Sequence, residues 1–199
     1  MLSSITPLGE RGRAQRWWLT VTAHILGSAL GGALLGALLG LVGTPLVAWI
    51  GEVAVAVVVG VVALGALAAD ASGGRLPLPR YGRQVNEDWM TSYRGWVYGG
   101  GFGLQLGAGL TTIVTAGLVY VVFVTCLLSG SWLLGGLIGL TFGLVRGLAI
   151  LAARGVHDPD ALVVFHRRLQ ARASWARVAT VVGDLAVVVV AVGATVTLA

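Results

Sequence analysis

Long uncharged hydrophobic stretches alternate along this chain with short segments that carry nearly all of the charged residues. A helix needs roughly 20 apolar residues to cross the hydrocarbon core of a bilayer. Five stretches meet this requirement, at residues 17–42, 50–69, 95–128, 132–153 and 178–199. The pattern predicts an all-α, polytopic membrane protein whose residues 1–199 form a single transmembrane domain, a bundle of five helices.

The third stretch, from Gly95 to Leu128, contains no charged residue and is too long for one straight crossing. We expect it either to tilt strongly or to break in its glycine-rich part, between Gly99 and Gly109. Non-helical backbone is tolerated at membrane depth only where protein or a water-filled cavity surrounds it. Both alternatives stay open on the sequence alone.

Arginines, the only basic residues besides histidine, gather before the first stretch and in the segments 70–94 and 154–177, while Arg146 stands apart. Cytoplasmic segments of membrane proteins carry an excess of basic residues. We therefore predict a bacterial cytoplasmic (inner) membrane protein with its N-terminus inside and its C-terminus outside. Residues 70–94 and 154–177 are then cytoplasmic loops.

The second of these loops contains a helix start signal, Asp158-Pro159-Asp160. The helix that follows has apolar residues on one face and arginines around the other, so it either lies on the membrane surface or continues into the last span. In the first loop, residues 76–80 are expected to be extended because of their two prolines. The mixed-charge segment 83–94 is expected to face a partner.

Glycines recur every fourth residue in three of the stretches, so each set forms a stripe along its predicted helix. Lipid provides no hydrophobic drive for helix association, and small residues allow the close backbone approach that replaces it. These glycine ladders, a glycine-zipper arrangement, predict a tightly packed bundle. Their members are Gly32, Gly36 and Gly40 in the first stretch, Gly99, Gly103 and Gly107 in the third, and Gly135, Gly139, Gly143 and Gly147 in the fourth.

Four polar side chains fall inside the predicted spans at similar depth from the arginine-rich side: His24, Gln105, Arg146 and Asp184. A charged side chain at the bilayer centre costs about 2.5–3.5 kcal/mol on insertion scales. We therefore expect Arg146 and Asp184 to form an ion pair that Gln105 and His24 complete with hydrogen bonds. This polar layer indicates either a proton or solute site or a structural contact between spans.

The segment from Tyr98 to Thr112, YGGGFGLQLGAGLTT, resembles the glycine-rich, helix-breaking segment of the CcdA/DsbD-like transmembrane redox proteins. That family continues into a Thr-Pro-Cys turn, whereas neither proline nor cysteine follows Thr111 and Thr112 here. The resemblance implies a similar broken helix and transfers no catalytic residue. The whole chain also resembles multi-pass membrane proteins of high-GC Gram-positive bacteria, a likeness that implies no particular activity.

Hydrophobic residues make up 57% of the chain and charged residues 11%, whereas soluble domains have about 25% charged residues. This composition excludes a soluble enzyme, and the single cysteine, Cys126, excludes a disulfide scaffold. The arginines lie beside predicted spans, so we expect anionic lipid headgroups and not nucleic acid as their partners. His24, His157 and His166 lack metal-ligand spacing, and we expect neither a metal nor a cofactor.

These features predict a multi-pass membrane protein without enzymatic activity of its own. We expect it to act as a membrane-complex component or assembly factor through its arginine-rich cytoplasmic loops, with another membrane protein or a second copy of itself as partner. One alternative is a small-solute or proton-coupled transporter that uses the polar layer. A second alternative is a redox-associated protein in which Cys126 reacts with an external thiol partner.

Overall fold

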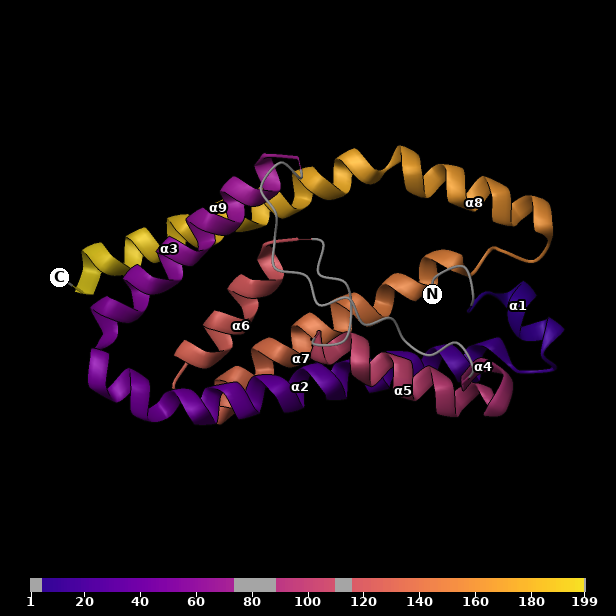
Figure 1. Ribbon diagram of the computed structural model, residues 1–199, viewed down its shortest axis with the longest axis horizontal. Helices are drawn as coiled ribbons and strands as arrows, with labels where there is room; N and C mark the ends of the chain where they lie inside the picture. Colours follow the sequence, from indigo (N-terminus) through magenta and orange to yellow (C-terminus); the bar gives the residue numbers. More distant parts are fainter. Residues whose placement is uncertain (1–4, 74–88, 110–115, 199) are drawn as a thin grey trace. The chain divides into compact units, whose positions relative to one another are not determined.

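A computed structural model describes residues 5–73, 89–109 and 116–198, and these residues form helices and no strand (Figure 1). The helices are α1 (Pro7–Gly12), α2 (Trp17–Ile50), α3 (Glu52–Ala71), α4 (Trp89–Ser92), α5 (Gly95–Ala108), α6 (Leu118–Leu128), α7 (Trp132–Leu148), the 3-10 helix η1 (Ala149–Ala153), α8 (Pro159–Ala171) and α9 (Ala173–Leu198). The predicted all-α class is confirmed for the part of the chain that the structure describes.

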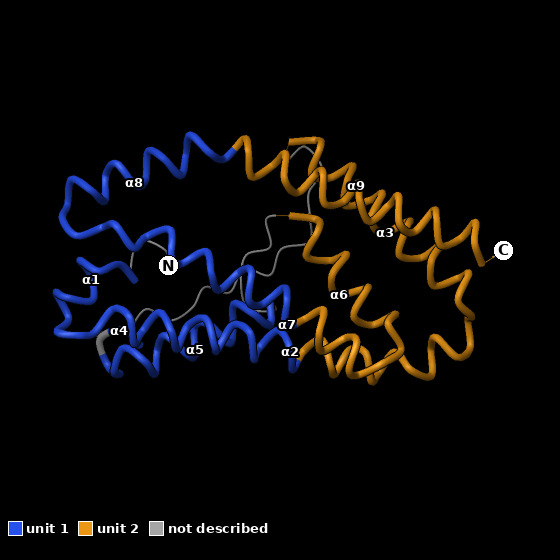
Figure 2. Tube along the Cα trace, turned by 180° about the vertical axis from the view of Figure 1, so that it is seen from behind, with its two compact units in different colours: residues 1–34, 83–112, 140–173 blue, residues 35–82, 113–139, 174–199 orange. Residues whose placement is uncertain are grey.

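The chain divides into two compact units, which Figure 2 shows in different colours. Unit 1 consists of residues 1–34, 83–112 and 140–173, and unit 2 consists of residues 35–82, 113–139 and 174–199. Helices α2 and α7 each contribute one part to unit 1 and the other part to unit 2. The single transmembrane domain over 1–199 stays a prediction.

Four helical segments of the described residues are long and apolar enough to cross a membrane: α2, α3, α7 together with η1, and α9. On α2, the residues Leu26, Leu30, Leu34 and Leu38 recur at four-residue spacing, and each leaves more than half of its surface exposed. Soluble proteins rarely expose contiguous apolar rows of this kind. The described helices therefore support a multi-pass helical membrane protein.

The first turn between membrane-length helices lies later than the sequence predicts. The first span was expected to end near Val42, before Thr44 and Pro45, but α2 continues through Pro45 to Ile50. Proline removes one backbone hydrogen bond from a helix, and membrane helices tolerate this loss because neighbouring groups satisfy the freed carbonyls. The chain instead turns at Gly51, whose φ of 80° favours glycine.

The third predicted span contains two separate helices. Helix α5 runs without interruption through the glycines from Gly99 to Gly107 and ends at Gly109, which has a left-handed φ of 69°. Helix α6 begins at Leu118, and residues 110–115 lie outside the described residues. With 14 and 11 residues, neither helix alone has the length of a crossing. The count of five spans is therefore not confirmed.

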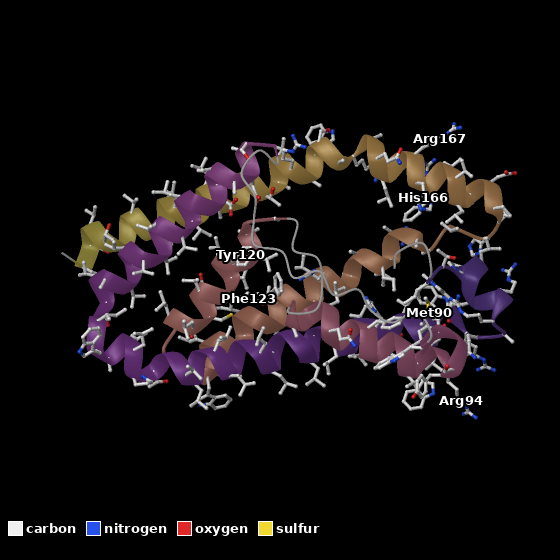
Figure 3. The ribbon with its side chains drawn as sticks, viewed as in Figure 1. Met90, Arg94, Tyr120, Phe123, His166 and Arg167 are labelled. Carbon is white, nitrogen blue, oxygen red and sulfur yellow. The ribbon has the colours of Figure 1, made fainter. Side chains whose placement is uncertain are left out.

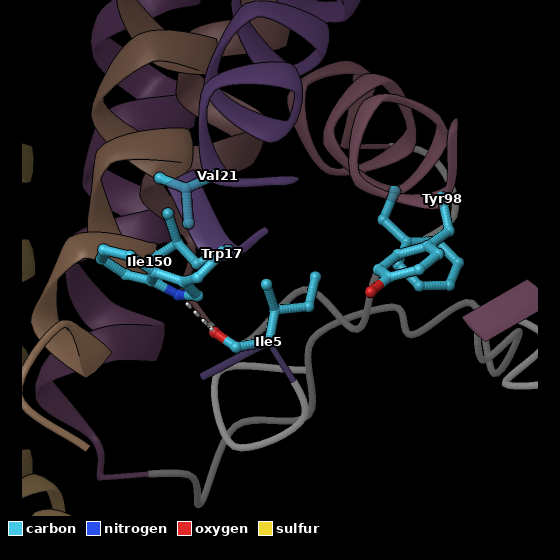
Figure 4. Close-up of a cluster of buried hydrophobic side chains, with 6 residues drawn as sticks. Ile5, Trp17, Val21, Tyr98 and Ile150 are labelled. Carbon is cyan, nitrogen blue, oxygen red and sulfur yellow. Dashed lines mark hydrogen bonds between the residues drawn. The ribbon is translucent and has the colours of Figure 1, made fainter. Parts of the chain in front are cut away.

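The core of unit 1 joins the N-terminal segment to α2, α5 and η1. Its buried members are Ile5, Trp17, Val21, Tyr98, Phe102 and Ile150, most of which Figure 4 labels. The indole N–H of Trp17 donates to the carbonyl oxygen of Ile5 at 3.4 Å, which ties the residues before α1 to the start of α2. In unit 2 the core is made of small side chains, with Ala63 and Ala66 of α3 packed against Val121 of α6.

Close backbone contacts join α2 to α5 and to the end of α7 within unit 1. A Cβ atom added to Gly103 would overlap the carbonyl oxygen of His24, and one added to Gly107 or Gly143 would overlap that of Ser28. The Ser28 hydroxyl also donates to the carbonyl oxygen of Gly143 at 2.7 Å. In unit 2, a Cβ atom added to Gly36 would overlap the carbonyl oxygen of Gly135, and one added to Gly135 would overlap that of Gly36.

Candidate functional site

The structure distributes the predicted polar layer over both units. His24, Gln105 and Arg146 belong to unit 1, whereas Asp184 belongs to unit 2. The ion pair between Arg146 and Asp184 therefore joins groups of different units and stays a prediction.

Within unit 1, His24 is buried on α2, and its Nδ1 atom has no hydrogen-bond partner among the described residues. Arg146 on α7 is half-buried, with its guanidinium 5.1 Å from the centre of the Phe142 ring. A cation over an aromatic face is stabilised by the quadrupole of the ring. Gln105 on α5 is half-buried as well.

In unit 2, Asp184 lies in the middle of α9 with none of its surface exposed. Neither of its carboxylate oxygens has a hydrogen-bond partner within the described residues. The carboxyl group of Asp70, in the last turn of α3, lies close enough to interact with it directly. Two carboxyl groups that share a buried site are not both charged at low cost, and a single shared proton relieves the repulsion. The arrangement is chemically suited to holding a proton.

Asp70 is a site residue that the sequence pattern did not predict, because the predicted second span ends at Ala69, one residue before it. Both of its carboxylate oxygens accept from the backbone N–H of Gly117, at 2.8 and 3.0 Å. Gly117 precedes the first residue of α6, where the helix dipole favours a negative charge. An acidic residue in the last turn of its own helix is unfavourable, so Asp70 could have been recognised as a residue that needs a partner elsewhere.

A second buried acidic residue, Glu10 of α1, was also missed. It accepts hydrogen bonds from the hydroxyls of Tyr98 and Thr20, at 2.5 and 2.7 Å, and it forms an ion pair with Arg13. Burial by itself lowers the pKa of Arg13, but hydrogen bonds with Glu10 and Tyr98 outweigh this and raise it. The Thr6-Pro7 pair was the sequence feature that could have predicted helix α1, which has Glu10 in its first turn. In the structure the Thr6 hydroxyl caps this helix by accepting a hydrogen bond from the N–H of Gly9.

Helix α8 begins as the sequence predicts. Asp158 caps it by accepting from the N–H of Ala161 at 2.7 Å, and Pro159 and Asp160 follow in the first turn. The helix ends at Ala171 with Arg172 as its C-terminal cap, and α9 begins at Ala173. In Figure 3, Arg167 points away from α7 and η1, while His166 lies on the opposite side of α8. Residues 74–88, which contain the proline pair and the first half of the mixed-charge segment 83–94, lie outside the described residues.

The thiol of Cys126 is buried in α6, with its sulfur atom 3.6 Å from the carbonyl oxygen of Gly135. Thiol exchange requires access to the sulfur, so no observation favours the redox alternative. Within the described residues, no group of three or more histidine, cysteine or acidic side chains is placed to hold a metal ion.

The chain is similar in part to a methylamine utilization protein. It is 37% identical over 134 residues to the methylamine utilization protein MauF of Paracoccus versutus. The match covers 65% of this chain and 48% of MauF, so the chain spans about half the length of that relative. No protein-family model and no solved structure matches the chain. The resemblance to the CcdA/DsbD-like proteins stays unconfirmed.

Proposed function

We propose that this chain is a membrane accessory protein, without enzymatic activity of its own, that supports the assembly or operation of a membrane-bound system. The similarity to MauF, which is named for methylamine utilization, carries this proposal. The membrane-length helices support it, because they suit a protein that works within the bilayer. By the same similarity, the system served is proposed to be one for amine utilization.

The outward face of α8 is the proposed contact surface. Val163 and Arg167 are exposed on it, at the four-residue spacing that places both side chains on one side of the helix. A basic, partly apolar helix face of this kind fits an acidic protein surface. The partner is proposed to be another membrane protein with acidic residues at the membrane boundary, or a second copy of this chain.

Purification of the tagged chain from native membranes in a mild detergent, followed by mass spectrometry, tests the proposal. We expect one membrane protein, or a second copy of the chain, to co-purify in a fixed ratio. The Arg167→Glu variant should lose this partner, whereas Arg16→Glu, at an exposed arginine before α2, should retain it. Recovery of the wild-type chain alone and monomeric, under conditions that preserve other membrane complexes, would contradict the proposal.

Proton-coupled transport is a second candidate function, which the Asp70–Asp184 arrangement favours. A buried carboxyl group beside a second carboxyl group is expensive to keep charged inside a membrane protein, and such groups mark proton and ion pathways. Proteoliposomes that contain a pH-sensitive dye would report proton entry under an imposed membrane potential. Transport predicts entry that Asp184→Asn abolishes and that Asp160→Asn, at an exposed position of α8, leaves unchanged. Wild-type entry equal to that of empty liposomes would rule out a proton pathway that operates without a second solute.

A further inference from the structure

A cavity of about 530 Å³ lies between η1 and α8 in unit 1. Its volume is within the range of small-molecule sites in proteins. Three arginines line it, namely Arg154, Arg168 and Arg172, and all three are exposed. None of them forms an ion pair with a described residue, and no acidic residue is among the described residues that line the cavity. The cavity therefore has a strong unbalanced positive charge.

The α8 side of the cavity is formed by a single helix face. Its members follow the three- and four-residue spacing of such a face: Ala161, Val164, Phe165, Arg168, Leu169 and Arg172. Apolar side chains thus line the part near the start of the helix, and arginines line the part near its end. Arg167 is not among the lining residues and points away from η1 (Figure 3).

The residues that line the cavity indicate which part of the membrane it faces. Helix η1 ends the membrane-length segment Trp132–Ala153, so the cavity begins where hydrocarbon gives way to headgroups. A ligand at this level that is anionic at one end and apolar at the other matches the lining of arginines beside Leu151 and Leu169. We propose that the cavity binds the phosphate-bearing headgroup of an anionic phospholipid. Basic pockets at the ends of membrane helices bind lipid phosphates in this way.

A neighbouring cavity supports the same assignment. It has a volume of about 410 Å³ and is lined by Arg11, Trp17, Trp18 and again Arg154, among others. Tryptophan is enriched at the headgroup level, where its ring is half in an apolar and half in a polar environment. Arg154 lines both cavities and has no acidic partner among the described residues. Two adjoining basic cavities beside the exposed indole of Trp18 suit a lipid phosphate.

Native mass spectrometry of the purified full chain tests the proposal, after incubation in nonionic detergent with equal amounts of phosphatidylglycerol and phosphatidylcholine. We expect the wild-type chain to retain phosphatidylglycerol preferentially. Each arginine near a lipid surface contributes about fivefold in affinity, so the Arg168→Gln/Arg172→Gln double variant should lose the preference about 25-fold. The matched control Arg167→Gln removes a charge from the other face of α8 and should keep the preference.

Three outcomes would overturn the proposal. They are equal retention of the two lipids by the wild-type chain, a loss in Arg167→Gln as large as in the double variant, and ready displacement of phosphatidylglycerol by millimolar inorganic phosphate. The last result would identify a site for free anions and not for lipid. The wild-type comparison of lipids stands even if a variant does not fold. The partner experiment above depends on Arg167, so the failure of one proposal is distinguishable from the failure of the other.

Discussion

Glu10 makes the N-terminal segment part of the folded protein. This carboxylate has no exposed surface, and its partners Arg13, Tyr98 and Thr20 come from the turn after α1, from α5 and from α2. Removing one partner of a buried ionic network leaves the others without compensation. We expect Glu10→Ala to lower the free energy of unfolding by about 3 kcal/mol, the lower end of the usual range because Arg13 is partly exposed.

Thermal unfolding in detergent measures the Glu10→Ala effect, and Glu52→Ala is its control. Glu52 is exposed in the first turn of α3, where its interaction with the helix dipole contributes about 0.3–1 kcal/mol. A midpoint for Glu10→Ala as high as that for Glu52→Ala would show that the network does not stabilise the fold.

Asp184 has two candidate partners, and a double-mutant cycle distinguishes them. The sequence predicts an ion pair with Arg146, whereas the structure places the carboxyl group of Asp70 beside it. Residues that interact directly show coupling of about 0.5–3 kcal/mol in such a cycle. We expect Asp184→Asn to couple with Asp70→Asn, measured by unfolding in detergent, and coupling with Arg146→Gln in the same cycle tests the predicted ion pair. Coupling with Arg146→Gln alone would favour the predicted ion pair.

The polar residues show where the sequence was informative and where it was not. The similar depth predicted for His24, Gln105, Arg146 and Asp184 rests on counting residues along each span, because the helix rise is constant, and it stays a prediction. Which of them meet depends on how helices rotate and pack, and no periodicity gives this. Asp70 was missed for a related reason: its hydrogen-bond donor is the backbone N–H of Gly117, which lies 47 residues further along the chain.

Helix α5 approaches α2 through glycines. Some glycines on α5 contact the α2 backbone and others have room for a side chain, so alanine substitutions at one of each kind test how closely the two helices pack. A Cβ atom at Gly107 would overlap the Ser28 carbonyl, whereas one at Gly100 would have its nearest neighbour, the Ala23 carbonyl oxygen, at an ordinary 3.8 Å. We expect Gly107→Ala to destabilise the protein by about 1–3 kcal/mol through overpacking. Gly100→Ala should be neutral or stabilising by up to about 1 kcal/mol, because alanine favours the helix.

Thermal unfolding of the Gly107→Ala and Gly100→Ala variants measures this difference in stability. Equal midpoints would mean that α2 and α5 separate freely to accommodate a methyl group, which is incompatible with close packing of these helices.

The ends of helices could be predicted from the sequence where neighbouring residues alone determine them. The start of α8 at Asp158-Pro159 was predicted and is confirmed, because a capping carboxylate and a proline at the first turn act through neighbouring residues alone. The end of α2 was not predicted, because Thr44 and Pro45 are typical of a turn in water. In α2 the Thr44 hydroxyl donates to the carbonyl of Gly40, and the helix continues.

For the whole molecule, hydropathy predicted the helical membrane class and five crossings, and the structure supports the class without confirming the count of five. The described residues include four helices of membrane length, and α5 and α6 divide the remaining apolar stretch between them. A short helix contributes to a crossing only if the segment beside it completes the path within protein or a water-filled cavity. Whether residues 95–128 cross the membrane determines on which side of it α8 lies relative to Tyr93.

We expect residues 95–128 to cross once, which places Tyr93 and Arg167 on the same side of the membrane and Ser131 on the other. Single cysteines at these positions, in a Cys126→Ser background, can be labelled in intact cells and in inverted vesicles with a membrane-impermeant maleimide. Tyr93→Cys and Arg167→Cys should react only in inverted vesicles, because basic loops face the cytoplasm. Ser131→Cys should react only in intact cells. If α5 and α6 do not complete a crossing, α7 alone separates the two loops, and Tyr93→Cys and Arg167→Cys would be labelled from opposite sides.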